Sequence, residues 1–250
     1  MKTKLRYLLV VAALFGCVKE THAPDALTAI SAVVDVTDPH TIYPDANSIL
    51  SLFGFQWDEN KAASFSLRAI TDMQYNPSVV LHLEDGATTS HRNRLDNPQF
   101  RKWVVRGFYE QVRDTIAHFT AIHRAAKPMK HSEIYRAIAS ELQVLQASGA
   151  QQTYLMIHSD LAENSDVFNA YARPWPKPER LHKKLLAAHA LPNNLTGIRV
   201  YFIYAPKNRL EDERYRFMVS VYTSLLESRG AEVVMQPYNA LQYVTNKTGP

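Results

Sequence analysis

Short apolar runs alternate with longer segments of helical periodicity along most of this 250-residue chain, and this alternation is the feature that most limits the folds open to it. Runs of β-branched, aliphatic and aromatic residues predict strands. Amphipathic segments that open on Asp, Asn, Ser or Pro and close near Gly predict helices. The expected strands are residues 27–36, 64–70, 78–84, 152–160, 197–206 and 231–237, and the expected helices are residues 45–55, 98–122, 132–149, 175–191 and 210–230.

This order of elements predicts an α/β fold. Strands separated by helices form a mostly parallel sheet that is covered on both faces, here a Rossmann-like three-layer sandwich. Only a turn-forming segment joins the strands at 64–70 and 78–84, so they are expected to form a hairpin that adds one antiparallel edge strand. With 46% hydrophobic residues, the chain can build one sizeable core, and we expect a single domain over residues 28–250.

The N-terminal segment has the features of a targeting sequence. Lys2, Lys4 and Arg6 precede an apolar run at residues 7–15, which is shorter than the roughly 20 residues that a membrane-spanning helix needs. A basic segment followed by a short apolar segment and a small residue is typical of a secretory signal peptide. We place this signal peptide at residues 1–16.

The sequence Leu-Phe-Gly-Cys at residues 14–17 resembles the lipobox of bacterial lipoproteins, in which the Cys is lipidated and becomes the mature N-terminus. The resemblance implies lipidation at Cys17, a short tether over residues 17–27, and a membrane-anchored protein of the bacterial cell envelope. Cys17 is the only cysteine of the chain, so an intrachain disulfide is excluded. The alternative is an ordinary signal peptide with an incidental cysteine.

The charge balance gives no indication of nucleic-acid binding. The formal net charge of +4 includes the three basic residues of the signal peptide, and without them 25 basic residues stand against 24 acidic ones. No basic stripe interleaved with aromatic residues is present in the sequence. We therefore expect no nucleic-acid partner.

Oxygen-bearing side chains follow two of the expected strands. Asp35 and Thr37 come directly after the first strand, Asp160 ends the strand at 152–160, and Ser132 stands where a helix is expected to start. Ligands of open α/β sheets bind beyond the carboxyl ends of the strands, where these four side chains could converge. Carboxylates and hydroxyls are ligands of hard cations, so the sequence indicates a site for Mg²⁺ or Mn²⁺.

These residues resemble the metal-ion-dependent adhesion site of the von Willebrand factor A domain family. That site has an Asp-x-Ser-x-Ser segment after the first strand, a Thr in a later loop and an Asp after the fourth strand. Asp35 and Thr37 match the first segment, Ser132 is the candidate for the later Thr, and Asp160 matches the final Asp. Pro39 stands in place of the second Ser, so one hydroxyl ligand is missing.

The resemblance covers roughly residues 28 to 237 and implies a function. Members of the family recognise other proteins at the metal-bearing rim, where a carboxylate of the partner completes the metal's ligands. We therefore expect a protein-binding module for an unknown envelope protein, and not an enzyme. The resemblance implies Asp35, Thr37, Ser132 and Asp160 as the metal ligands.

Other interpretations of the same residues stay open. Asp after a strand is often a turn former or a helix N-cap, and Ser132 could be no more than an N-cap. An envelope hydrolase could use Asp35 and Asp160 around Mg²⁺ for phosphoryl chemistry, and a domain that lost its metal site could be an inert scaffold. Trp175 could be an exposed anchor for a partner or could pack against the domain.

Overall fold

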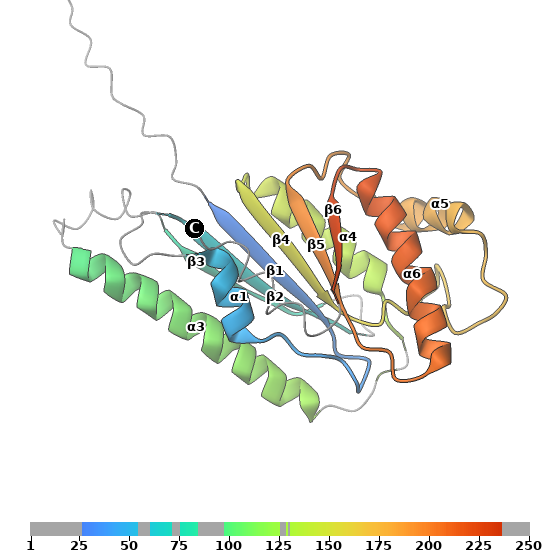
Figure 1. Ribbon diagram of the computed structural model, residues 1–250, viewed down its shortest axis with the longest axis horizontal. Helices are drawn as coiled ribbons and strands as arrows, with labels where there is room; N and C mark the ends of the chain where they lie inside the picture. The colour runs from blue at the N-terminus through green and yellow to red at the C-terminus, as the bar shows by residue number, and fades with distance from the viewer. Residues whose placement is uncertain are drawn as a thin grey trace, which may run out of the picture.

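The computed structural model describes residues 27–54, 61–71, 76–84, 98–125, 129 and 131–236. Six strands form one sheet in the order β3-β2-β1-β4-β5-β6 (Figure 1). The strands are β1 (Thr28–Asp35), β2 (Ala63–Ile70), β3 (Ser78–Leu83), β4 (Gln152–His158), β5 (Ile198–Ile203) and β6 (Glu232–Gln236). All neighbouring pairs are parallel except β2 and β3, which are antiparallel. The predicted α/β fold with one antiparallel edge strand is confirmed.

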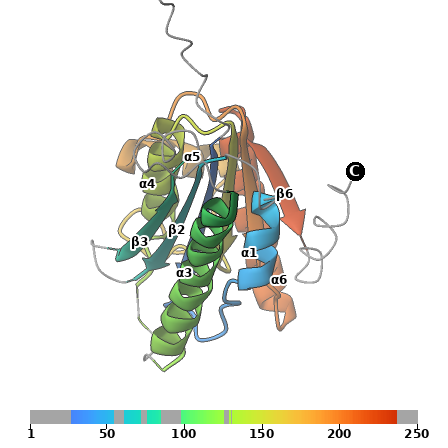
Figure 2. The same ribbon diagram turned by 90° about the vertical axis from the view of Figure 1, so that its left-hand side faces the viewer.

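Helices cover both faces of this sheet. They are α1 (Ala46–Phe53), α3 (Pro98–Arg124), α4 (Ile134–Ala147), α5 (Pro178–Ala188) and α6 (Arg209–Glu227). Helices α1 and α3 lie in front of the sheet in Figure 1 and α4 and α5 lie behind it, and Figure 2 shows the same separation from the side. Helix α6 packs in the same core as α4 and α5. Among the described helices, none is both long enough and apolar enough to cross a bilayer.

The central strand shows why both faces had to be covered. Every residue of β1 is buried, as expected for a strand inside a parallel sheet. Ile30 and Val34 pack with α1 and α3, whereas Ala29 and Val33 pack with α4, α5 and α6. At the edge of the sheet, β3 leaves Val79 and Val80 about half exposed.

Two helix starts show where local sequence decides a boundary and where it does not. Asp45 caps α1 by accepting a hydrogen bond from the Ser48 amide at 2.8 Å, as its side chain predicted. Helix α4 starts at Ile134, so the expectation that a helix starts at Ser132 was wrong. The Ser132 backbone instead exchanges two hydrogen bonds with Asn164, at 3.1 and 3.0 Å, and this pairing holds it outside the helix.

Candidate site at the carboxyl ends of the strands

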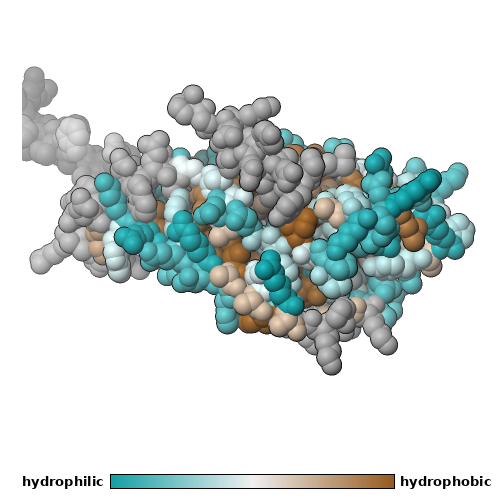
Figure 3. Space-filling model, turned by 60° about the horizontal axis from the view of Figure 1, so that its bottom comes forward, coloured by the Kyte–Doolittle hydropathy of each residue, from teal (hydrophilic) through white to brown (hydrophobic). Residues whose placement is uncertain are grey.

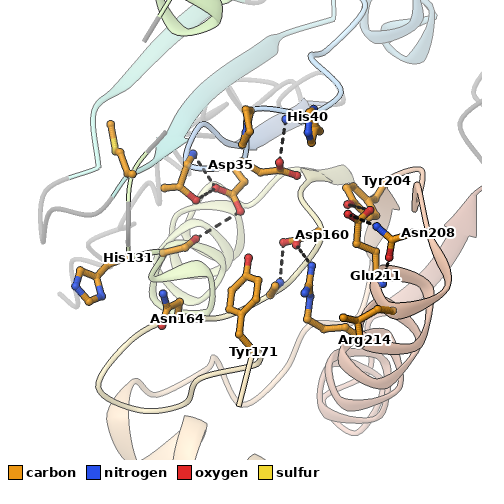
Figure 4. A pocket seen from close by; sticks show the side chains of 17 residues that line it. Asp35, His40, His131, Asp160, Asn164, Tyr171, Tyr204, Asn208, Glu211 and Arg214 are labelled. Carbon is orange, nitrogen blue, oxygen red and sulfur yellow. Dashed lines mark hydrogen bonds and ion pairs between the residues drawn. The ribbon is translucent and has the colours of Figure 1, made fainter. Parts of the chain in front are cut away.

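An open cleft of about 530 Å³ lies beyond the carboxyl ends of β1, β4 and β5 (Figure 4). The four residues that the sequence singled out as metal ligands, Asp35, Thr37, Ser132 and Asp160, all line it. We call this cavity the rim cleft. Strands β1 and β4 are adjacent and parallel. Asp35 is the last residue of β1 and Asp160 lies two residues beyond the end of β4, so both residues come to this edge of the sheet.

Asp35 lies on the floor of the rim cleft with 1% of its surface exposed. Its Oδ1 atom accepts hydrogen bonds from the Thr37 hydroxyl at 2.6 Å and from the Thr37 amide at 3.0 Å. Its backbone carbonyl accepts a hydrogen bond from the Thr41 hydroxyl. The bond from the amide two residues on is that of an Asx turn, so Asp35 is both a turn former and a cleft residue.

Two further hydroxyls reach the other oxygen of this carboxylate. Oδ2 of Asp35 accepts hydrogen bonds from Ser159 at 3.0 Å and from Ser132 at 3.4 Å. The pairing of Ser132 with Asn164 holds the loop before α4 against the loop after β4. Segments that are far apart in the chain therefore meet at one carboxylate.

Asp160 forms an ion pair inside the rim cleft. Its Oδ1 atom accepts a hydrogen bond from the Ala162 amide at 2.9 Å, and its Oδ2 atom lies 3.1 Å from Nη2 of Arg214 on α6. The Arg214 side chain is 12% exposed and the Asp160 side chain 6%. The guanidinium carbon of Arg214 also lies 4.3 Å from the centre of the Tyr171 ring, in cation–π contact.

Burial dominates the electrostatics of the two carboxylates. It raises the pKa of Asp35 against the opposing effect of the hydrogen bonds from Thr37 and Ser159. Burial first, and then the neighbouring Asp35 charge, raises the pKa of Asp160 to about 6, although Arg214 acts in the opposite direction. Two close carboxylates disfavour each other's charge, so an added positive charge is favourable at this position.

A third buried carboxylate holds the adjacent loop to α4. Glu163 is 2% exposed, and its Oε2 atom accepts a hydrogen bond from the Tyr135 amide at 2.8 Å. Tyr135 lies in the first turn of α4, where backbone amides have no partner inside the helix. Burial raises the pKa of Glu163 to about 7.

Other residues from the sequence analysis have structural roles. Pro39 lines the rim cleft and has no hydroxyl to offer there, while the neighbouring Asp38 accepts a hydrogen bond from the His40 amide at 2.8 Å. Trp175 stacks on Phe217 of α6, with ring centres 4.8 Å apart, and its Nε1 donates to the Ala170 carbonyl at 2.9 Å. These contacts place Trp175 against the domain. Cys17 lies outside the described residues.

In this arrangement, the oxygen atoms at the rim cleft that could ligate a divalent cation are not free to do so. Both oxygens of Asp35 already accept two hydrogen bonds each, which fills the roughly four acceptor positions of a carboxylate. The outer oxygen of Asp160 already binds Arg214. Within the described part of the chain, no group of three or more His, Cys, Asp and Glu side chains could hold a metal ion. The Mg²⁺ or Mn²⁺ site expected from the sequence would therefore require these hydrogen bonds and the ion pair to rearrange.

Sequence reasoning missed Ser159, Tyr171 and Arg214. Ser159 precedes Asp160 in the sequence and could have been noticed as another hydroxyl at the end of the same strand. Tyr171 and Arg214 carry no local signal, because only the tertiary packing of α6 and of the loop after β4 brings them to Asp160.

Comparison with known proteins identifies no family. No protein-family model matches the chain, and no curated protein matches it. Among solved structures, the chain is similar to an aerotolerance-related membrane protein from Bacteroides fragilis NCTC 9343, with 10% identity and a TM-score of 0.37 over 88% of this chain and 97% of that one. A similarity at this level does not establish a shared fold or activity.

Proposed function

We propose that this chain is a lipid-anchored protein of the bacterial cell envelope whose domain, similar to a von Willebrand factor A domain, binds another protein at the rim cleft. The observation that carries the proposal is the position and lining of this cleft. It lies at the carboxyl edge of a parallel sheet, where open α/β folds bind their ligands. Asp35 and Thr37, which the family resemblance singled out, lie 2.6 Å apart in it through Oδ1 and Oγ1.

The walls of the rim cleft have the composition of a protein-binding surface. Tyr171 and Leu210 line the cleft and are 57% and 56% exposed, so two large apolar side chains stand beside a polar floor. Among the residues coloured by hydropathy, the face turned forward in Figure 3 also mixes hydrophobic with hydrophilic side chains. Interfaces between proteins combine apolar anchors with a polar surround in this way.

The hydrogen bonding of Asp35 supports a binding role over the alternative of a phosphoryl hydrolase. Such a hydrolase would need free carboxylate oxygens on Asp35 and Asp160 to hold Mg²⁺ at the reacting phosphate. Both oxygens of Asp35 are occupied by Thr37, Ser132 and Ser159, and the residue is nearly fully buried. We therefore propose a binding module and not an enzyme.

Site-specific photo-crosslinking in cells tests the proposal on the full chain. A photoreactive amino acid is placed at Leu210 in the cleft wall and, as a matched control, at Val144, which is 51% exposed on α4. We expect a discrete crosslinked protein from position 210 and none from position 144. The proposal is wrong if position 210 gives no adduct, or if both positions give the same adducts.

A further inference from the structure

The side chain of Arg214 is held in the rim cleft by contacts of two kinds. Its Nη2 donates to Asp160 Oδ2 at 3.1 Å, and its guanidinium lies over the Tyr171 ring. Its Nε atom is buried and has no hydrogen-bond partner among the described residues. An arginine with 12% of its side chain exposed is uncommon unless it is paired, so this position is built around the ion pair.

Figure 4 shows the guanidinium reaching from α6 to the side of Asp160 that faces the cleft. The carboxylate oxygen that it binds is the one that Ala162 leaves free. A cation that used Asp160 as a ligand would need this same oxygen or a water beside it. The guanidinium and a metal ion would therefore compete for one place.

We infer that the Arg214 guanidinium takes the place of a divalent cation at the rim cleft, and that the cleft keeps its structure without metal. The ion pair supplies positive charge beside two neighbouring carboxylates, Asp35 and Asp160. It does so from within the chain, so the charge is present at any metal concentration. The inference does not depend on a protein partner, because metal binding alone is its readout.

The ion pair between Arg214 and Asp160 should be favoured over a metal ion bound to Asp160. A metal ion at Asp160 would separate Arg214 from its partner carboxylate while the guanidinium stayed largely buried. A buried charge that loses its partner is strongly unfavourable. Removal of the guanidinium should have the opposite effect, since it would free Oδ2 of Asp160 beside the neighbouring Asp35 carboxylate. Mg²⁺ or Mn²⁺ could then bind that oxygen and complete its ligands with water.

The experiment measures Mn²⁺ binding to the full chain in detergent by electron paramagnetic resonance, and the melting temperature with and without millimolar Mg²⁺. We expect no saturable Mn²⁺ binding and no Mg²⁺-dependent rise in melting temperature for the wild type. Arg214→Gln should bind Mn²⁺ saturably, with an affinity at least about tenfold above the weakest binding that the wild-type titration could detect, a factor typical of coupled binding. The gain should disappear in the double variant Arg214→Gln with Asp160→Asn.

A matched control comes from the same helix. Arg216 pairs with Asp212 at 2.9 Å and is 78% exposed, so Arg216→Gln removes one positive charge from α6 outside the cleft and should gain no Mn²⁺ binding. Saturable Mn²⁺ binding by the wild type that is lost in Asp35→Ala would overturn the inference. So would an Arg214→Gln variant that is folded but gains no metal. If Arg214→Gln does not fold, the wild-type titration decides the question by itself.

Discussion

Replacement of Glu163 by Gln should make the protein more stable at pH 8 than the wild type, with little difference at pH 5. Glu163 is buried beside the first turn of α4 and accepts a hydrogen bond from the Tyr135 amide. Burial raises its pKa from 4.5 to about 7. The folded state therefore holds this proton more tightly than the unfolded state does.

The sign of the pH effect follows from this order of pKa values. Between pH 4.5 and about 7, the folded protein binds more protons than the unfolded chain, so stability falls as the pH rises through this range. The favourable contribution of the protonated carboxyl is complete below pH 4.5 and is lost as the pH passes about 7. Each pKa unit corresponds to about 1.4 kcal/mol, so with a pKa raised from 4.5 to about 7 the ionisation of Glu163 costs the folded state roughly 3–4 kcal/mol at most.

Glutamine is a suitable replacement because it keeps an oxygen for the Tyr135 amide and carries no charge. Urea unfolding of both proteins at pH 5 and at pH 8 measures the effect as a change in the free energy of unfolding. Glu179→Gln, on an exposed position of α5, is the control and should leave the pH dependence of the wild type unchanged. The reasoning fails if the stability difference between Glu163→Gln and the wild type is the same at both pH values.

Three further outcomes test the packing and the anchor. Arg68→Leu should lower the free energy of unfolding in urea by about 3–5 kcal/mol, because it leaves the buried Glu141, which Arg68 binds at 2.7 Å, without a cation. The double variant with Glu141→Leu should regain most of this stability. Equal losses in the single and the double variant would contradict the argument. Leu142→Ala, at a fully buried position of α4, should cost about 2–5 kcal/mol and lower the urea midpoint without a change in slope; an unchanged midpoint would contradict it. Cys17→Ser should abolish incorporation of a labelled fatty acid and release the protein from the membrane fraction, whereas a variant that still takes up label would refute lipidation at Cys17.

The fold could be predicted because each strand is marked by a short apolar run in the sequence. The apolar runs predicted each strand to within two residues at most ends. The turn-forming sequence between the two strands correctly indicated the antiparallel pairing of β2 with β3. Helix α1 followed from the Asp45 cap and from Gly54, which adopts the left-handed conformation. Each of these features is determined by residues that are close in the sequence, so each could be predicted from the sequence alone.

The site could be predicted only in part, because its other half is assembled by tertiary contacts. The meeting of Asp35 and Asp160 followed from the parallel sheet. The position of Arg214 depends on which face of α6 turns toward the cleft, and the start of α4 depends on a backbone pairing with Asn164. No sequence pattern within α6 or around Ser132 indicates that Arg214 pairs with Asp160 or that Ser132 pairs with Asn164.

The order of strands in the sheet has a consequence for how the chain reaches its folded state. Strand β1 lies between β2, which follows it closely in sequence, and β4, where Thr28 pairs with Gln152. The centre of the sheet therefore closes only after more than half of the chain has been synthesised, and contacts of such long sequence separation slow folding. Until β4 arrives, one edge of the apolar strand β1 stays open, and exposed strand edges favour aggregation. If the chain crosses a membrane before it folds, as the proposed lipoprotein would, this edge stays open during transit, and β1 would need protection until the second half of the sheet follows.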